Sequence, residues 1–201
     1  MRTLPRLYAI ADAAFGDPVS LAAALFEGGA RLVQLRNKDA APATLLAQTE
    51  AILLAAPPGA LVIVNDHVDV ALIARAAGAH VGQDDLPPEA ARHVLGPEAI
   101  IGVSTHNLEQ ALAADRAPVD YIAVGPVFET RHKASPAAAL GLETLALICR
   151  SVTRPVVAIG GITLSSAPAV YQCGARSIAA IGDLVGAPDI AGRVRQWLEV
   201  A

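Results

Sequence analysis

Short apolar runs separated by helix-like segments recur along the chain, and their spacing limits the available folds more than any other feature. They begin about every 20–25 residues and occupy 6–12, 31–36, 61–66, 79–83, 100–104, 121–125, 156–161 and 177–182. Each run is almost continuously apolar, which is typical of parallel strands covered on both faces. The segments between them, such as 17–30 and 42–56, have helical apolar spacing and end at glycine or proline.

Eight strand–helix units in 201 residues predict an α/β fold, a (β/α)8 TIM barrel built as a single domain over residues 1–201. Each unit takes about 25 residues, which is near the lower limit for such a barrel. A doubly wound open sheet is the alternative, but no GxGxxG motif follows the first run. The longest irregular stretch, 126–141, follows the sixth run and is typical of a functional loop.

The composition argues against several classes of partner. A formal net charge of −4 does not favour binding to nucleic acid, and no apolar run approaches the roughly 18–20 residues of a membrane span. The residues after Met1 lack a signal-peptide pattern, and Cys149 and Cys173 are interpreted as two buried thiols of a cytosolic protein. We therefore expect a cytoplasmic protein with small-molecule substrates, and the Ala- and Leu-rich helices are compatible with a homo-oligomer.

Polar residues follow the predicted strands at their carboxyl ends, where a barrel of this kind builds its active site. Asp66 follows the third strand and the Asp84-Asp85 pair follows the fourth. Asp66 and one member of that pair are expected to face the same cavity, and adjacent carboxylates repel each other unless a cation lies between them. Because Arg36, Lys38 and Lys133 follow other strands, the pattern indicates a Mg²⁺-bound polyphosphate. The other polar residues at these ends are Gln34, Asn65, Gln83, Asp84, Ser104, Thr105, His106, Thr130 and His132.

A second anion site is predicted after the last two strands. Gly160 and Gly161 end the seventh strand, and residues 180–184, "AIGDL", follow the eighth. Adjacent glycines let backbone N–H groups approach a phosphate, and loops at these positions hold phosphate in many barrels. Asp183 would be unfavourable there unless its side chain caps the last helix and points away. Two anion sites favour an enzyme that joins a pyrophosphate-activated substrate to a phosphorylated one.

Each of these features also has a purely structural interpretation. Asp66 and the Asp84-Asp85 pair could cap the helices that follow them, residues 31–39 could form a charged rim, and the glycines could form a tight turn. No two histidines form an HxxxH or HxH motif, so packing, capping or surface roles are assigned to His67, His80, His93 and His106. The convergence of several strand ends on one barrel face favours the functional interpretation.

In these same stretches the sequence closely resembles the thiamine-phosphate synthase family. The matching stretches follow the family order and cover most of the chain: "QLRNKD" (34–39), "VNDHVDVAL" (64–72), "GAHVGQDDLP" (78–87), "IGVSTHN" (101–107), "DYIAVGPVFET" (120–130), "GLE" (141–143) and "VVAIGGIT" (156–163). The resemblance implies that 4-amino-5-hydroxymethyl-2-methylpyrimidine pyrophosphate condenses with a thiazole phosphate, giving thiamine phosphate and pyrophosphate, with Mg²⁺ required.

The resemblance also implies roles for individual residues. Asp66 and Asp85 would hold Mg²⁺, while Gln34 and Ser104 would face the pyrimidine. The pyrophosphate would be held by Arg36, Lys38, Asn65 and Lys133, and the thiazole phosphate by Thr130, Gly161 and the backbone near Ile181 and Gly182. Lys133 and Ser104 are the expected catalytic residues, and His132 is expected to contact substrate.

The chain departs from the family pattern at three places. Residues 129–133 read Glu-Thr-Arg-His-Lys where the family usually has Pro-Thr-x-Thr-Lys, so His132 replaces a threonine. Gly182 stands where the family usually has a serine. "FET" at 128–130 is similar to the related thiazole tautomerases, although Pro126 replaces their histidine. A tautomerase-like enzyme and a non-catalytic thiamine-phosphate-binding barrel are therefore the alternative functions.

Overall fold

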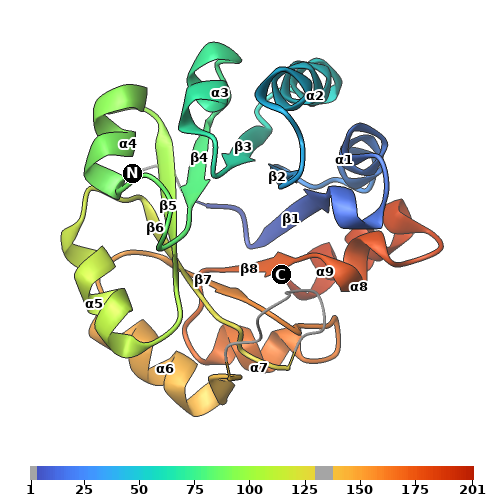
Figure 1. Ribbon diagram of the computed structural model, residues 1–201. Helices are drawn as coiled ribbons and strands as arrows, with labels where there is room; N and C mark the ends of the chain where they lie inside the picture. Colours follow the sequence, from blue (N-terminus) through green and yellow to red (C-terminus); the bar gives the residue numbers. More distant parts are fainter. Residues whose placement is uncertain (1–3, 130–137) are drawn as a thin grey trace.

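The computed structural model describes residues 4–129 and 138–201, in which eight parallel strands close into a barrel surrounded by helices (Figure 1). Each strand pairs with the next in chain order, and β8 pairs with β1 to complete the ring. The strands are β1 (Leu7–Asp12), β2 (Leu32–Arg36), β3 (Leu61–Asn65), β4 (Gly78–Val81), β5 (Ile100–Thr105), β6 (Tyr121–Val124), β7 (Val156–Ile159) and β8 (Ser177–Ala180). The predicted TIM barrel is confirmed.

Helices follow the strands and cover the outside of the barrel (Figure 1). They are η1 (Ala13–Phe15), α1 (Pro18–Glu27), α2 (Pro42–Ala55), α3 (Val68–Ile73), α4 (Pro88–Leu95), α5 (Leu108–Arg116), α6 (Gly141–Ser151), α7 (Ala167–Gln172), α8 (Gly182–Val185) and α9 (Ile190–Val200). Side chains cap several of them: Asp17, Asn107 and Asp189 each accept a hydrogen bond from a backbone N–H of the first turn. None of the helices in 4–129 or 138–201 is long and apolar enough to span a bilayer.

The strands pack on both faces, and this produces two apolar cores. On β1, Leu7, Ala9 and Ala11 belong to the core between the strands and the helices, whereas Tyr8 and Ile10 belong to the core inside the barrel. This alternation follows from the two-residue period of a strand. Each near-continuous apolar run of the sequence thus consists of two alternating sets of residues, one facing the helices and the other facing the inside of the barrel.

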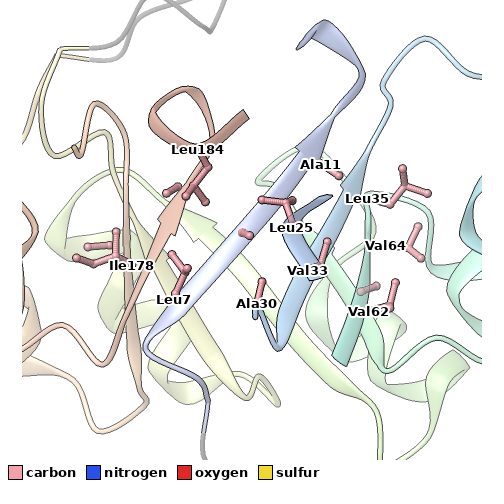
Figure 2. Close-up of a cluster of buried hydrophobic side chains, with 14 of the residues drawn as sticks. Leu7, Ala11, Leu25, Ala30, Val33, Leu35, Val62, Val64, Ile178 and Leu184 are labelled. Atoms are coloured by element: carbon pink, nitrogen blue, oxygen red, sulfur yellow. The ribbon is translucent and has the colours of Figure 1, made fainter. Parts of the chain in front are cut away.

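The outer core is the larger of the two. Figure 2 shows side chains of β1, β2, β3 and β8 that belong to this core together with Leu25 of α1 and Leu184 of α8. The fully buried Trp197 of α9 also belongs to this core, although the chain has few aromatic residues. Burial of these side chains holds the helices against the strands.

The same alternation decides which polar side chains point into the barrel. On β2, Val33 and Leu35 lie in the outer core, so Gln34 and Arg36 point inward and line the barrel cavity. Because β1 and β2 pair with Asp12 beside Arg36, both ends reach the same rim of the barrel. Because alternate residues of a strand face the same side, polar residues with this spacing lie together at the carboxyl ends of the strands.

Candidate active site

A cavity opens at the carboxyl-terminal mouth of the barrel, and every strand contributes at least one residue to its wall. It brings together five residues to which the family resemblance assigns substrate contacts, namely Gln34, Arg36, Asn65, Ser104 and Ile181. The other lining residues are Tyr8, Ile10, Asp12, His80, Thr105, His106, Ala123, Gly125, Pro126, Val157, Ile159, Gly160 and Ala179. The wall combines apolar side chains with a smaller number of polar ones, as is typical of small-molecule pockets.

Arg36 is held at this rim by a buried carboxylate. Its Nη1 donates to Oδ2 of Asp12, and Oδ1 of Asp12 accepts a hydrogen bond from the backbone N–H of Ala14 at 3.0 Å. Asp12 is 5% exposed, and Arg36 has a half-buried side chain. A guanidinium carries five N–H donors, so this ion pair orients the group and leaves further donors for an anion.

Asp66 lies at the end of β3 among other charged groups. Its backbone adopts a left-handed conformation with φ of 63°, and its Oδ2 is 3.6 Å from Nζ of Lys38. Burial raises the pKa of Asp66 above its usual range, and the nearby carboxylate of Asp85 raises it further, while Lys38 opposes both effects. The structure thus places Asp66, Asp85 and Lys38 together.

The structure does not support a helix-capping role for these acids. Helix α3 begins after His67, whose side chain makes no capping hydrogen bond, and α4 begins after Pro87. Oδ2 of Asp85 instead accepts a hydrogen bond from the backbone N–H of Gly82 at 2.7 Å, within its own loop. The described residues contain no group of three or more histidine, cysteine and acidic side chains that could hold a metal ion. A carboxylate pair of this kind suits Mg²⁺, which binds through one or two carboxylates together with substrate phosphates and water.

A chain of buried polar side chains crosses the inside of the barrel below this rim. Nε2 of Gln34 donates to the Tyr8 hydroxyl at 2.8 Å, and the Tyr8 and Tyr121 hydroxyls are 2.9 Å apart. The Tyr121 hydroxyl lies 2.9 Å from Nδ1 of His80, and Nε2 of His80 lies 2.8 Å from Oγ of Ser104. Burial raises the pKa of both tyrosines above the ordinary value, so each remains a neutral hydroxyl. We call these five residues the polar chain.

A second cavity follows β7 and β8, and it shares Ile159, Gly160, Ala179 and Ile181 with the first. Gly161 and Gly182, both predicted from the sequence, line it. Gly160 and Gly161 have φ of 100° and 65°, and a Cβ on Gly161 would lie 2.5 Å from the carbonyl oxygen of Glu129. Only glycine fits this turn, which leaves its backbone accessible to a ligand.

Asp183 lines the second cavity, but its carboxylate is engaged elsewhere. Its Oδ2 accepts a hydrogen bond from Nε1 of Trp197 at 2.7 Å and lies 3.9 Å from Nε of Arg193. Both partners are on α9, so the negative charge is directed toward the last helix. The cap of α9 is Asp189 and not Asp183.

The loop after β6 begins against the second cavity. The backbone N–H of Val127 donates to the carbonyl of Ile159 at 2.9 Å, and that of Phe128 donates to the carbonyl of Gly160 at 3.0 Å. His106 supports the start of this loop, because its Nδ1 lies 2.7 Å from the carbonyl oxygen of Gly125. The three residues expected to contact substrate from this loop lie outside the described residues: Thr130, His132 and Lys133.

Comparison with known proteins identifies the family of this chain. A family model described as thiamine monophosphate synthase matches residues 7–184. A thiamine-phosphate synthase of Koribacter versatilis is 45% identical over 192 residues, covering 92% of this chain and 91% of the relative, and that of Anaeromyxobacter dehalogenans is 46% identical, covering 91% and 82%. The chain belongs to the thiamine-phosphate synthase family. It is accordingly an enzyme, a transferase of thiamine biosynthesis, as the resemblance predicted.

A solved structure agrees with this membership in the thiamine-phosphate synthase family. Thiamine phosphate pyrophosphorylase from Pyrococcus furiosus superposes with a TM-score of 0.90 at 36% identity, covering 97% of this chain and 94% of that one. The fold and the family are therefore established together.

In this member of the thiamine-phosphate synthase family, the sequence interpretation missed Asp12 and three members of the polar chain. His80 was assigned a packing, capping or surface role, whereas the structure places it between Tyr121 and Ser104. One signal was available: only 3% of residues are aromatic, yet two of the three tyrosines lie within predicted strands. A buried tyrosine hydroxyl needs a hydrogen-bond partner, which indicates a polar contact inside the protein but does not identify His80 as a member.

Proposed function

We propose that this synthase joins 4-amino-5-hydroxymethyl-2-methylpyrimidine pyrophosphate to a thiazole phosphate, releasing pyrophosphate and forming thiamine phosphate. The observation that supports the proposal is a group of charged side chains at the strand ends beside a cavity built on a glycine turn. Arg36 lines the barrel cavity, Lys38 lies with Asp66 and Asp85, and the glycine turn at Gly161 lies in an adjoining cavity. This arrangement would suit an enzyme that binds a diphosphate and a monophosphate side by side.

Mg²⁺ is the cofactor that the rim fits. Asp66 and Asp85 would hold it, because their adjacent carboxylates repel each other and a divalent cation would relieve the repulsion. A bound Mg²⁺ would stabilise the charge that develops on the departing pyrophosphate. Asn65, which is 9% exposed at the end of β3, is proposed to contact the same group.

The chain's own residues would bind and align the reactants. The C–O bond of the pyrimidine substrate breaks with its electron pair passing to pyrophosphate, and the thiazole nitrogen supplies the electron pair of the new C–N bond. No nucleophile from the protein is consumed. Arg36 and Lys38 would stabilise the leaving charge, Gln34 and Ser104 would orient the pyrimidine, and Lys133 is proposed to act on the pyrophosphate.

The second cavity would hold the thiazole phosphate. Its proposed ligands are Thr130 and the backbone of Gly161, Ile181 and Gly182, with His132 nearby in sequence. Gly182 lacks the serine hydroxyl that the family pattern has there, but it keeps the backbone N–H. The carboxylate of Asp183 is bonded to Trp197, so it does not compete with the anion.

The proposal is tested by incubating the purified protein with both substrates and Mg²⁺ and analysing the products by chromatography. Thiamine phosphate and pyrophosphate should form, chelation of the metal should stop the reaction, and added Mg²⁺ should restore it. A folded protein that gives no product contradicts the proposal. Metal-independent turnover of the thiazole phosphate alone would identify a tautomerase, and tight thiamine-phosphate binding without turnover would identify a binding protein.

We also propose a cytoplasmic location, since Cys149 and Cys173 are free thiols and burial raises the pKa of both. We also propose that the protein forms a homo-oligomer through the outer surface of the neighbouring helices α2 and α3. On this surface Leu54 and Ile73 are 91% and 63% exposed. Sedimentation of the protein measures the oligomeric state directly.

A further inference from the structure

The polar chain has a direction, and that direction follows from counting protons. Nε2 of Gln34 donates to the Tyr8 hydroxyl, so the Tyr8 oxygen acts as the acceptor in that bond. The Tyr8 proton then has one remaining partner among the described residues, the Tyr121 hydroxyl. Because a neutral tyrosine carries one hydroxyl proton, Tyr8 donates to Tyr121 and Tyr121 must donate to Nδ1 of His80.

The same count continues through the imidazole to the other end of the chain. A neutral His80 that accepts at Nδ1 carries its proton on Nε2, which donates to Oγ of Ser104. The Ser104 hydroxyl proton is then available to the cavity that Ser104 lines. At the opposite end, Oε1 of Gln34 accepts no hydrogen bond from the described residues. Every fully buried side-chain oxygen or nitrogen of the described residues has a hydrogen-bond partner. Because Oε1 of Gln34 has none, it is not fully buried, and it faces the cavity that Gln34 lines.

We infer that Tyr8, Tyr121 and His80 are positioning residues that fix the hydrogen-bond polarity of the pyrimidine pocket. They hold Gln34 as an acceptor and Ser104 as a donor. A 4-aminopyrimidine matches this polarity, because its amino group donates and its ring nitrogens accept. A 4-oxopyrimidine does not match, because an oxygen then faces the Gln34 oxygen. The identity of the ring in this inference rests on the proposed function. The direction of the hydrogen bonds along the polar chain does not depend on that function.

The rings of the chain are packed so that the direction is not easily lost. Tyr121 stacks on His80 with ring centres 5.6 Å apart and meets Tyr8 edge-on at 5.8 Å. Tyr121 also covers Gly102, where a Cβ would lie 2.0 Å from the ring. All members are buried or half-buried, so reversing the chain requires every proton in it to move together.

The direction is measured without any substrate by ¹⁵N NMR of the histidine side chains at about pH 8, well above the ordinary histidine pKa. The His80 signals are identified by their loss in His80→Gln. We expect the proton on Nε2 in the wild type and a mixture of tautomers in Tyr121→Phe, which cuts the chain and keeps the ring. A proton on Nδ1 of wild-type His80 would mean that the chain runs in the opposite direction, and the inference would be wrong.

The consequence for recognition is measured by calorimetry with the pyrimidine pyrophosphate and its 4-oxo analogue, in the absence of the thiazole. The wild type should prefer the amino compound by about 10- to 100-fold, and Tyr121→Phe should reduce the preference to about threefold. Tyr8→Phe cuts the chain at a second link and should act alike. Tyr171→Phe is the control, because its hydroxyl bonds the carbonyl of Arg6 outside the barrel, at 2.9 Å.

Retention of the full preference in both folded chain variants would overturn the positioning role, even with the expected tautomer. A wild type that shows the expected tautomer and ring preference but forms no thiamine phosphate would contradict the proposed function and leave this inference standing. The two failures are therefore distinguishable.

Discussion

Replacing Asp85 by asparagine should change stability and activity in opposite directions. The exposed Asp85 carboxylate raises the pKa of Asp66, whose side chain is 22% exposed, so the two charges repel each other in the metal-free protein. For a pair that is partly screened by solvent, removing the repulsion is worth about 0.5 kcal/mol. In a protein of 201 residues this raises the melting temperature by about 1–2 °C.

The same substitution should remove most of the activity. The introduced asparagine keeps an oxygen that can accept the hydrogen bond from the Gly82 N–H, which is 2.7 Å from the present carboxylate, so the loop is preserved. The side chain loses the charge that the proposed Mg²⁺ site needs. We expect kcat/KM to fall at least about 100-fold, which corresponds to about 2.7 kcal/mol of transition-state stabilisation.

The assay combines thermal unfolding with steady-state kinetics, each measured with and without Mg²⁺. Mg²⁺ should raise the melting temperature of the wild type but not of Asp85→Asn. The control is Asp84→Asn, which removes an adjacent exposed acid from the same loop and should change neither quantity appreciably. Activity within about threefold of the wild type in Asp85→Asn would mean that Asp85 is not a metal ligand, and a lower melting temperature would mean that the two carboxylates do not repel each other.

Three further predictions concern other parts of the barrel. Burial and Asp85 raise the pKa of Asp66 above its ordinary value of about 4. Mg²⁺ binding measured by calorimetry should therefore weaken as pH falls through that raised pKa. The stability that protonated Asp66 contributes is present at low pH and lost as pH rises through the same pKa. In urea unfolding of the metal-free protein, this contribution to the free energy of unfolding should therefore decrease as pH rises. Gly161→Ala would place a Cβ 2.5 Å from the Glu129 carbonyl, so KM for the thiazole phosphate should rise at least about tenfold; an unchanged KM contradicts the assignment. Arg92→Ala removes bonds to Asp120 and to the carbonyl of Ala99, and should lower the free energy of unfolding by about 2 kcal/mol in urea; a comparable loss of kcat at a temperature where the variant is folded would contradict this purely structural role.

The strand positions could be predicted from the sequence because each strand is short, β-branched and bounded by helix signals. The glycine turn after the seventh strand could also be predicted, since adjacent glycines at a strand end indicate a backbone conformation that other residues disfavour. Both residues have a positive φ, which explains why glycine occupies both positions. The residues of this turn are therefore readable without a structure.

The polar chain could not be predicted in the same way. In a strand that is apolar on both faces, the sequence pattern does not say which residues face the inside of the barrel. The side on which Tyr8, His80 and Tyr121 fall follows from the register and closure of the barrel, which depend on contacts far apart in sequence. The pairing of Asp12 with Arg36 depends on the same register.

The proposed metal and pyrophosphate site can be observed in a crystal structure of the protein with Mg²⁺ and pyrophosphate. We expect a metal ion bound by Asp66 and Asp85, with the pyrophosphate reaching Arg36 and Lys38 at the mouth of the barrel. Pyrophosphate bound elsewhere, or a metal ion that contacts neither carboxylate, would contradict it.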